Sequence, residues 1–162
     1  MRNAIFGRGA LSALLAAAAI AFAGVAVGQT RTFSFAYDQP TTTAYGIAAN
    51  IFDAKLKELS NNTMSINQFP GAQLGQEPQA LQKMRAGDID FVITSTANAS
   101  TLAPQAGVFS LHFIFRDQAH LAATLADPAV SKAFRDMIKD SVQGAQVLGL
   151  LTMGMRNMYS KK

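Results

Sequence analysis

The residues best suited to chemistry are few in this sequence of 162 residues. His112 and His120 are the two histidines, and His112 alternates within an apolar run, as a structural histidine does. Asp88 and Asp90 are close in sequence, but no general-acid partner accompanies them, and they more simply mark the entrance of a strand. The sequence has no phosphate-binding glycine loop, nucleophile elbow or zinc-protease motif. We therefore expect a protein that is not an enzyme, with no catalytic residue, no cofactor and no metal site.

Polar residues gather instead in three segments that would follow predicted strands, at residues 37–43, 69–77 and 94–100. In an open α/β sheet, ligands bind beyond the carboxyl ends of the strands and near helix N-termini. Arg156 lies near the chain end, and a guanidinium can bind both oxygens of a carboxylate without losing its charge. From its position alone, Arg156 is more simply a solvated surface arginine.

The elements that would position these segments are read from hydrophobic periodicity. Strands are predicted over residues 32–37, 64–69 and 88–94, the last with the near-continuous apolar run of a central parallel strand. Helices are predicted over residues 42–60 and from Pro78 to Gly87. Strand, helix, strand, helix and strand at this spacing give two βαβ units, which are right-handed by strong preference.

The first predicted helix has one apolar face, with residues repeating at intervals of three and four. This face consists of Tyr45, Ala48, Phe52, Leu56 and Leu59, and Ile47 and Ile51 are expected to widen it. Asn61 and Asn62 can adopt the left-handed backbone that ends a helix, and Gly87 suits the same position after the second helix.

The second half of the chain is less regular. Residues 94–107 are expected to form a loop with one short helical turn, followed by a dense apolar stretch over residues 109–115. A short helix is predicted over residues 118–126, and a longer one begins at Pro128 with Asp127 as its N-cap and Gly144 as its stop. Its apolar face is Val130, Phe134, Met137, Ile138 and Val142, and a further strand is expected over residues 146–152.

The composition excludes several classes of protein. With 49% hydrophobic and 15% charged residues, the chain is not disordered by composition, and with no cysteine it has no disulfide or thiolate metal site. The net charge of +4 comes from the ends, because residues 29–160 carry ten basic and ten acidic side chains. No basic patch remains, so the sequence predicts no nucleic-acid partner.

Residues 1–28 have the layout of a secretory signal peptide. Two arginines precede an uncharged run of 18 residues from Ala10 to Val27, and small residues precede the expected cleavage site before Gln29. The alternative is a retained membrane anchor, since this run is at the lower limit for spanning a bilayer. The alanine-rich composition and the lack of a following basic cluster favour cleavage. We expect an exported domain over residues 29–162, with no membrane span after cleavage.

Four blocks of this sequence resemble one family. They are FPGAQLG at residues 69–75, GDIDF at residues 87–91, FSLHFIFRD at residues 109–117, and GMRN at residues 154–157. Together they resemble the substrate-binding proteins of TRAP transporters, the tripartite ATP-independent periplasmic importers. The resemblance covers residues 32–162, and the first two blocks are specific at their spacing.

The resemblance implies a two-lobed periplasmic receptor that captures an organic acid and delivers it to the membrane permease subunits of a transporter. This chain would supply a type II periplasmic-binding-protein-like α/β lobe, with a mostly parallel sheet and helices on both faces. In that family context Arg156 would bind the ligand's carboxylate. The other residues expected to border the cleft are Gln76, Glu77, Thr94, Ser95 and Tyr37.

The sequence departs from the family pattern at two points. His112 stands where the family usually has proline, which concerns the local turn. The chain is about half the usual family length, so that the second lobe and a later carboxylate-binding arginine are expected to be largely missing and ligand binding to be weak. Two alternatives remain open: a solute-binding protein of an ATP-driven importer, and an exported enzyme.

Overall fold

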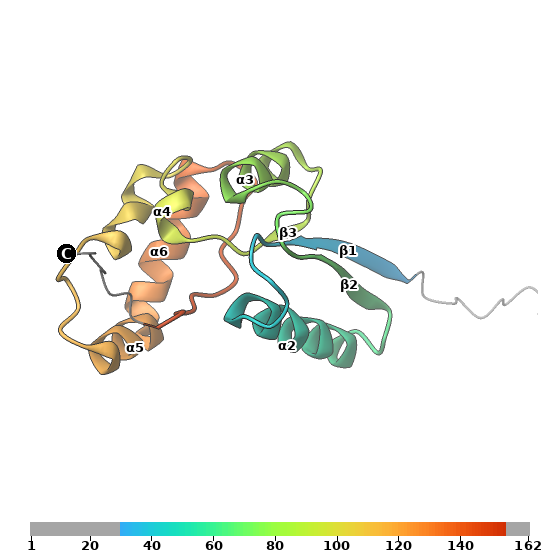
Figure 1. Ribbon diagram of the computed structural model, residues 1–162, viewed down its shortest axis with the longest axis horizontal. Coiled ribbons are helices and arrows are strands. Elements are labelled where there is room, and N and C mark those ends of the chain that lie inside the picture. Colours follow the sequence, from blue (N-terminus) through green and yellow to red (C-terminus); the bar gives the residue numbers. More distant parts are fainter. Residues whose placement is uncertain (1–29, 155–162) are drawn as a thin grey trace, which may run out of the picture.

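The computed structural model describes residues 30–154, and its first half is built on a parallel sheet (Figure 1). The strands are β1 (Arg31–Ala36), β2 (Met64–Phe69) and β3 (Phe91–Val92), in the order β2-β1-β3. Both β2 and β3 pair with β1 in parallel. This arrangement confirms the two predicted βαβ units.

Strand β3 is shorter than predicted because a side chain replaces part of its ladder. The Ser34 backbone N–H donates to Oδ2 of Asp90 over 2.9 Å, and the Ser34 hydroxyl donates to the same oxygen over 2.8 Å. The Asp90 N–H in turn donates to Ser34 Oγ over 2.9 Å. Asp90 thus marks a strand entrance, as expected, but regular pairing begins only at Phe91.

Helices cover both faces of the sheet, as predicted (Figure 1). On one face, α2 (Ala44–Leu59) buries Tyr45 and Ala49 against Phe35 and Tyr37 of the first strand segment. On the other face, α3 (Glu77–Ala86) buries Ala80 against Ala36 and Ile89. The alternation of Phe35, Ala36 and Tyr37 between the two faces follows from the two-residue repeat of a strand.

The widened apolar face predicted for α2 is wrong. Ile47, Ile51 and Leu59 are 54%, 65% and 72% exposed, whereas Tyr45 and Ala49 are buried. The sheet beneath the helix has three strands, one of them only two residues long, and it therefore covers only a narrow stripe of α2. Periodicity identified the helix but not how much of it would be covered.

The predicted helix ends are confirmed by backbone geometry. Asn61 and Asn62 have φ angles of 51° and 60°, and the Asn62 N–H donates to the Lys57 carbonyl over 2.8 Å. Gly87 has a φ angle of 90° at the end of α3. At the start of α2, Gly46 is required for close approach, because a Cβ there would overlap the backbone carbonyl of Thr41.

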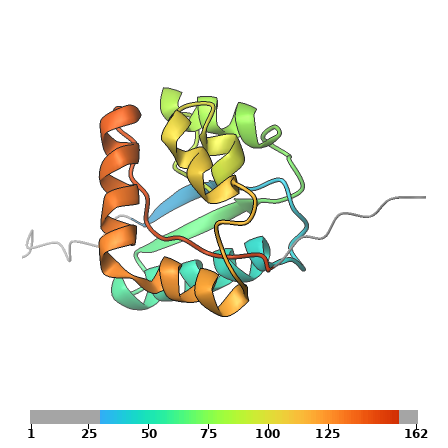
Figure 2. The ribbon, with the colours of Figure 1, turned by 90° about the vertical axis from the view of Figure 1, so that its left-hand side faces the viewer.

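The second half is helical. It contains α4 (Thr96–Ala99), the 3₁₀ helix η1 (Pro104–Ser110), α5 (Gln118–Ala126) and α6 (Pro128–Ser141). Figure 2 shows α6 beside η1, with α5 at its foot. The bounds of α5 and the start of α6 are as predicted, and Asp127 caps α6 by accepting the Ala129 N–H over 2.7 Å.

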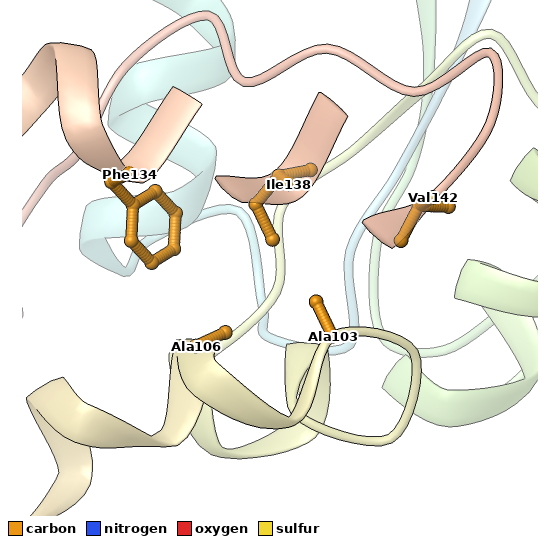
Figure 3. Packing of buried hydrophobic residues seen from close by; sticks show 5 residues of the cluster. All are labelled: Ala103, Ala106, Phe134, Ile138 and Val142. Carbon is orange, nitrogen blue, oxygen red and sulfur yellow. The ribbon is translucent and has the colours of Figure 1, made fainter. Parts of the chain in front are cut away.

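The core of this half is small. Ala103 and Ala106 face Phe134, Ile138 and Val142, all from α6 or the residue that follows it (Figure 3). Three residues of the predicted apolar face of α6 are thus buried. No helix within residues 30–154 is long and apolar enough to cross a membrane.

One expectation for the second half is wrong. Residues 146–152 form no strand, and the Leu148 carbonyl instead accepts a hydrogen bond from the Arg135 guanidinium over 3.0 Å. The apolar stretch over residues 109–115 is only partly buried, since Leu111 is 59% and Phe113 101% exposed. Phe113 has a left-handed φ angle of 64°, which turns this segment outward.

Candidate functional site

The segments that follow β1 and β2 are joined by backbone hydrogen bonds. The Tyr37 N–H donates to the Phe69 carbonyl over 3.2 Å, and the Ala72 N–H donates to the Tyr37 carbonyl over 3.2 Å. The Gly71 N–H donates to the Gln39 carbonyl over 3.0 Å. The loops at the carboxyl ends of these two strands are therefore fixed to each other.

The loop after β3 is held by the carboxylate of Glu77, which is 5% exposed in the first turn of α3. Its Oε2 accepts hydrogen bonds from Thr94 Oγ1 at 3.0 Å, Ser95 N at 2.8 Å, Ser95 Oγ at 2.8 Å and Asn98 Nδ2 at 2.6 Å. Its Oε1 accepts from the Tyr45 hydroxyl at 3.3 Å. We call these five residues the Glu77 cluster. The cluster joins α2, α3 and the start of α4.

The Glu77 carboxylate is ionised at neutral pH. Burial opposes ionisation, but the hydrogen bonds from Asn98, Ser95 and Thr94 outweigh it and hold the pKa of Glu77 below its usual value. The N-terminus of α3 adds a favourable dipole. Within residues 30–154, no lysine or arginine forms an ion pair with Glu77. The charge is thus stabilised by neutral donors.

Tyr37 lies in the core rather than on the surface. Its side chain is 2% exposed, packs edge-on against the rings of Phe35 and Tyr45, and donates its hydroxyl to Gln68 Oε1 over 2.7 Å. Burial raises the pKa of Tyr37. Its backbone, and not its hydroxyl, reaches the loop after β2.

The other predicted site residues are placed as follows. Gln76 is exposed at the N-cap position of α3, and its side chain makes no cap hydrogen bond. Thr94 and Ser95 are half-buried and adjoin Glu77. Arg156 lies outside the described residues. The structure thus brings together Glu77, Thr94 and Ser95, with Gln76 adjacent to Glu77 in sequence.

Asn98, within the predicted polar segment 94–100, and Tyr45 also bond to Glu77, although neither was predicted as a site residue. Ser95 caps α4 by accepting the Asn98 N–H over 3.2 Å, so the Ser-x-x-Asn spacing at the predicted helical turn was an available signal for Asn98. No short-range signal existed for Tyr45, which is 32 residues from Glu77.

The remaining candidate groups have local roles. His120 Nδ1 accepts the Arg116 N–H over 3.2 Å at the start of α5, and His112 is exposed. Among the residues that the structure describes, no group of three or more histidine, aspartate or glutamate side chains is placed to hold a metal ion.

Two hollows lie in the other half of the molecule. One, of about 410 Å³, is lined mainly by apolar residues of η1 and α6, including Val108, Phe109 and Met137. The other, of about 260 Å³, lies between α6 and residues 146–148. Neither is lined by the loops that follow the strands.

A parallel α/β sheet with polar loops fixed together at its strand ends defines the class of ligand-binding α/β lobes. Residues 35–162 match the profile of the bacterial extracellular solute-binding proteins, family 7, and the chain belongs to this family. It is 30% identical over 150 residues to the ectoine/5-hydroxyectoine-binding periplasmic protein UehA of Ruegeria pomeroyi. That alignment covers 91% of this chain and 43% of UehA.

Solved structures show the same relationship. A TRAP periplasmic solute-binding protein from Xanthobacter autotrophicus with bound β-D-galacturonate superposes with a TM-score of 0.64 at 28% identity, covering 67% of this chain and 36% of that one. The sugar acid binding protein of Advenella mimigardefordensis in complex with galactonate gives a TM-score of 0.64 at 26% identity, covering 70% and 36%. The chain thus spans less than half the length of these relatives.

Proposed function

We propose that this protein is the periplasmic solute receptor of a TRAP transporter and that it captures an organic acid. The observation that carries the proposal is the joining of the three strand-end loops in a chain of the solute-binding family. Relatives with bound galacturonate and galactonate support a hydroxylated organic acid as ligand. Relatives named as binding proteins support a receptor rather than an enzyme.

The ligand would lie across the carboxyl ends of β1, β2 and β3. In this proposal Gln76, Thr94 and Ser95 face the ligand, because each is at least partly exposed at the loop surface. Tyr37 and Glu77 border the cleft from behind, where they hold the wall in place. Arg156 binds the carboxylate, since its guanidinium offers two parallel donors to both oxygens.

The proposal includes a cleaved signal peptide over residues 1–28 and a ligand-binding lobe over residues 29–162. The receptor would release its ligand to the permease subunits of a membrane transporter. A cleft encloses a ligand only when both walls are present. Residues 29–162 alone are therefore expected to bind weakly or not at all.

Isothermal titration calorimetry on the native full-length gene product tests this function. The ligands are D-galacturonate, D-galactonate, ectoine and succinate, and we expect at least one to bind with micromolar or tighter affinity. Binding of none of them, or turnover of any of them, would contradict the proposed function.

The role of Arg156 has its own test in the same assay. Arg156→Lys replaces a bidentate fork by a point charge, and we expect it to weaken binding by about tenfold or more. Arg85→Lys, at an exposed position of α3, is the matched control and should leave affinity unchanged. Equal affinities for both variants would show that Arg156 is a solvated arginine that does not bind the carboxylate.

Gene neighbourhood separates the TRAP receptor from a receptor of an ATP-driven importer. A large and a small permease gene without an ATPase gene beside this one supports the TRAP transporter. An adjacent ATPase gene would instead indicate the ATP-driven importer.

A further inference from the structure

The hydroxyl protons of the β3–α4 loop point inward. A serine or threonine hydroxyl has one proton to donate and two lone pairs. Thr94 Oγ1 lies 3.0 Å from Glu77 Oε2 and 3.4 Å from the Ser95 carbonyl, and both are acceptors within the protein. Because Glu77 is ionised, it can only accept, so the Thr94 proton is used internally and its lone pairs remain.

The same holds for the other donors of this loop. Ser95 gives both its hydroxyl proton and its backbone N–H to Glu77 Oε2. Asn98 gives one of its two side-chain N–H groups to the same oxygen over 2.6 Å, so this side chain retains its carbonyl oxygen as an acceptor and one N–H as a donor. One lone pair of the Ser95 hydroxyl already accepts the Asn98 backbone N–H, yet the half-buried surface of Thr94, Ser95 and Asn98 still offers more lone pairs than protons to a ligand.

The buried charge of Glu77 also favours a ligand group that donates hydrogen bonds over a carboxylate. Glu77 carries a negative charge that no lysine or arginine of residues 30–154 pairs with. It is 5% exposed, and a charge in such surroundings is weakly screened by solvent. A ligand carboxylate placed on this loop would meet this charge and find fewer side-chain donors than acceptors.

We infer that Thr94, Ser95 and Asn98 form a hydrogen-bond-acceptor subsite that receives a hydroxyl or protonated amine of the ligand and disfavours its carboxylate. The inference rests on the proposed function and refines it, since it sets which end of an organic acid faces this wall. Glu77 acts here as a positioning residue, because it orients the three side chains and does not itself touch the ligand.

The test compares ligands that differ in donor groups, using calorimetry on the native full-length gene product. D-galactonate, D-galacturonate and ectoine carry hydroxyl or N–H donors, and succinate carries two carboxylates and no such donor. We expect the best of the three donor ligands to bind more tightly than succinate by on the order of a hundredfold. A ligand without a donor leaves the acceptors of the site unpaired, which weakens its binding strongly.

Two variants with matched controls locate this preference. Thr94→Val removes an acceptor, and we expect about a tenfold loss of affinity for the best donor ligand, whereas Thr94→Ser keeps the hydroxyl and the affinity. Glu77→Gln removes the charge, and we expect the ratio of the affinity for the best donor ligand to the affinity for succinate to fall by about tenfold. Glu58→Gln, on the exposed face of α2, should leave the preference unchanged. Thermal unfolding of each variant shows that it is folded, and Thr94→Val keeps the test valid if Glu77→Gln does not fold.

The outcomes separate this inference from the proposed function. Succinate binding as tightly as the best donor ligand would overturn the acceptor subsite while leaving the organic-acid receptor in place. An unchanged preference in folded Thr94→Val would do the same. Binding of none of the four ligands would contradict the receptor function, and the subsite with it.

Discussion

The two halves of the described chain are held together in different ways. In residues 30–95, a parallel sheet is covered on both faces, and the rings of Phe35, Tyr37, Phe52 and Phe91 contact one another. In residues 96–154, one helix packs against small residues of η1 and the preceding turn. The comparison shows that a clear helical pattern does not ensure deep burial, because burial depends on what lies opposite.

Both halves expose some apolar side chains, but their buried residues differ. Phe35, Tyr37 and Tyr45 of the first half are 5%, 2% and 5% exposed, whereas the buried residues of the second half include the two small side chains of Ala103 and Ala106. The second half therefore owes less of its stability to its own core. The Glu77 cluster links the halves, because Asn98 of α4 in the second half donates to Glu77 of the first.

The largest expected effect contrasts the two cores. Phe35→Ala should lower the free energy of unfolding by about 4 kcal/mol, because the neighbouring rings of Phe52 on α2 and Phe91 on β3 are held in place and cannot collapse into the cavity. Phe134→Ala should cost less, about 3 kcal/mol, because Phe134 lines an open hollow beside η1. Urea unfolding measures both.

Leu111→Ala is the control for this contrast. Leu111 is 59% exposed, so its truncation should change stability by less than about 0.5 kcal/mol. If Phe134→Ala cost as much as Phe35→Ala, the two cores would be equally well packed, and the comparison would fail.

Glu77→Gln tests the link between the halves. We expect a loss of about 2 kcal/mol at neutral pH, because four donors lose a charged acceptor. Since the folded-state pKa of Glu77 lies below its ordinary value of 4.5, its stabilisation is present above that pH and is lost as the pH falls through the folded pKa. Unfolding curves of wild type and variant should therefore converge in acid.

Asp90 and Asp53 also have lowered pKa values, and they contribute equally to the pH dependence of stability in the wild type and in Glu77→Gln. The difference between wild type and Glu77→Gln therefore isolates Glu77. A difference that stays constant from neutral pH to well below pH 4.5 would show that the ionised form of Glu77 is not what holds the loop.

Within the second half, the N-cap of α6 should matter more than any exposed apolar residue. Asp127→Ala removes the acceptor for the Ala129 N–H, with an expected loss of about 1 kcal/mol. Asp127→Asn keeps a capping oxygen and should cost only a few tenths of a kcal/mol, so roughly equal losses for the two variants would exclude a capping role. Thermal unfolding resolves this difference.

The smallest effect has the opposite sign. Phe113 has a φ angle of 64° and no side-chain burial, so Phe113→Gly should relieve backbone strain and raise the free energy of unfolding by about 0.5 kcal/mol. Leu111→Gly, at a φ angle of −67°, should instead be destabilising. Destabilisation by Phe113→Gly would show that the exposed ring contributes contacts.

Local signals predicted most of the fold. Asp127 and Pro128 placed the start of α6, and Gly87 and the two asparagines placed helix ends, because capping needs only neighbouring residues. The failures have tertiary causes. The start of β3 was shortened because Ser34 bonds to the side chain of Asp90, 56 residues away in sequence. Residues 146–152 form no strand, and their Leu148 carbonyl bonds to Arg135 of α6 instead of joining the sheet.

The location of the candidate site was predicted, but not whether its side chains offer hydrogen-bond donors or acceptors to a ligand. The family resemblance and the strand-end positions led to Glu77, Thr94 and Ser95, which the structure brings together. Neither source showed that the Glu77 carboxylate faces inward, because this depends on the Tyr45 hydroxyl and the Asn98 amide, which come from other elements. Their ligand contacts, and that of Arg156, stay predictions.

A crystal structure of the native full-length gene product with bound D-galacturonate tests the central claim most directly. We predict that the sugar acid lies against the loops after β1, β2 and β3, with hydroxyl groups on Thr94, Ser95 or Asn98 and the carboxylate turned away from them. Density for the sugar acid away from these loops, or a carboxylate seated on residues 94–98, would contradict the account.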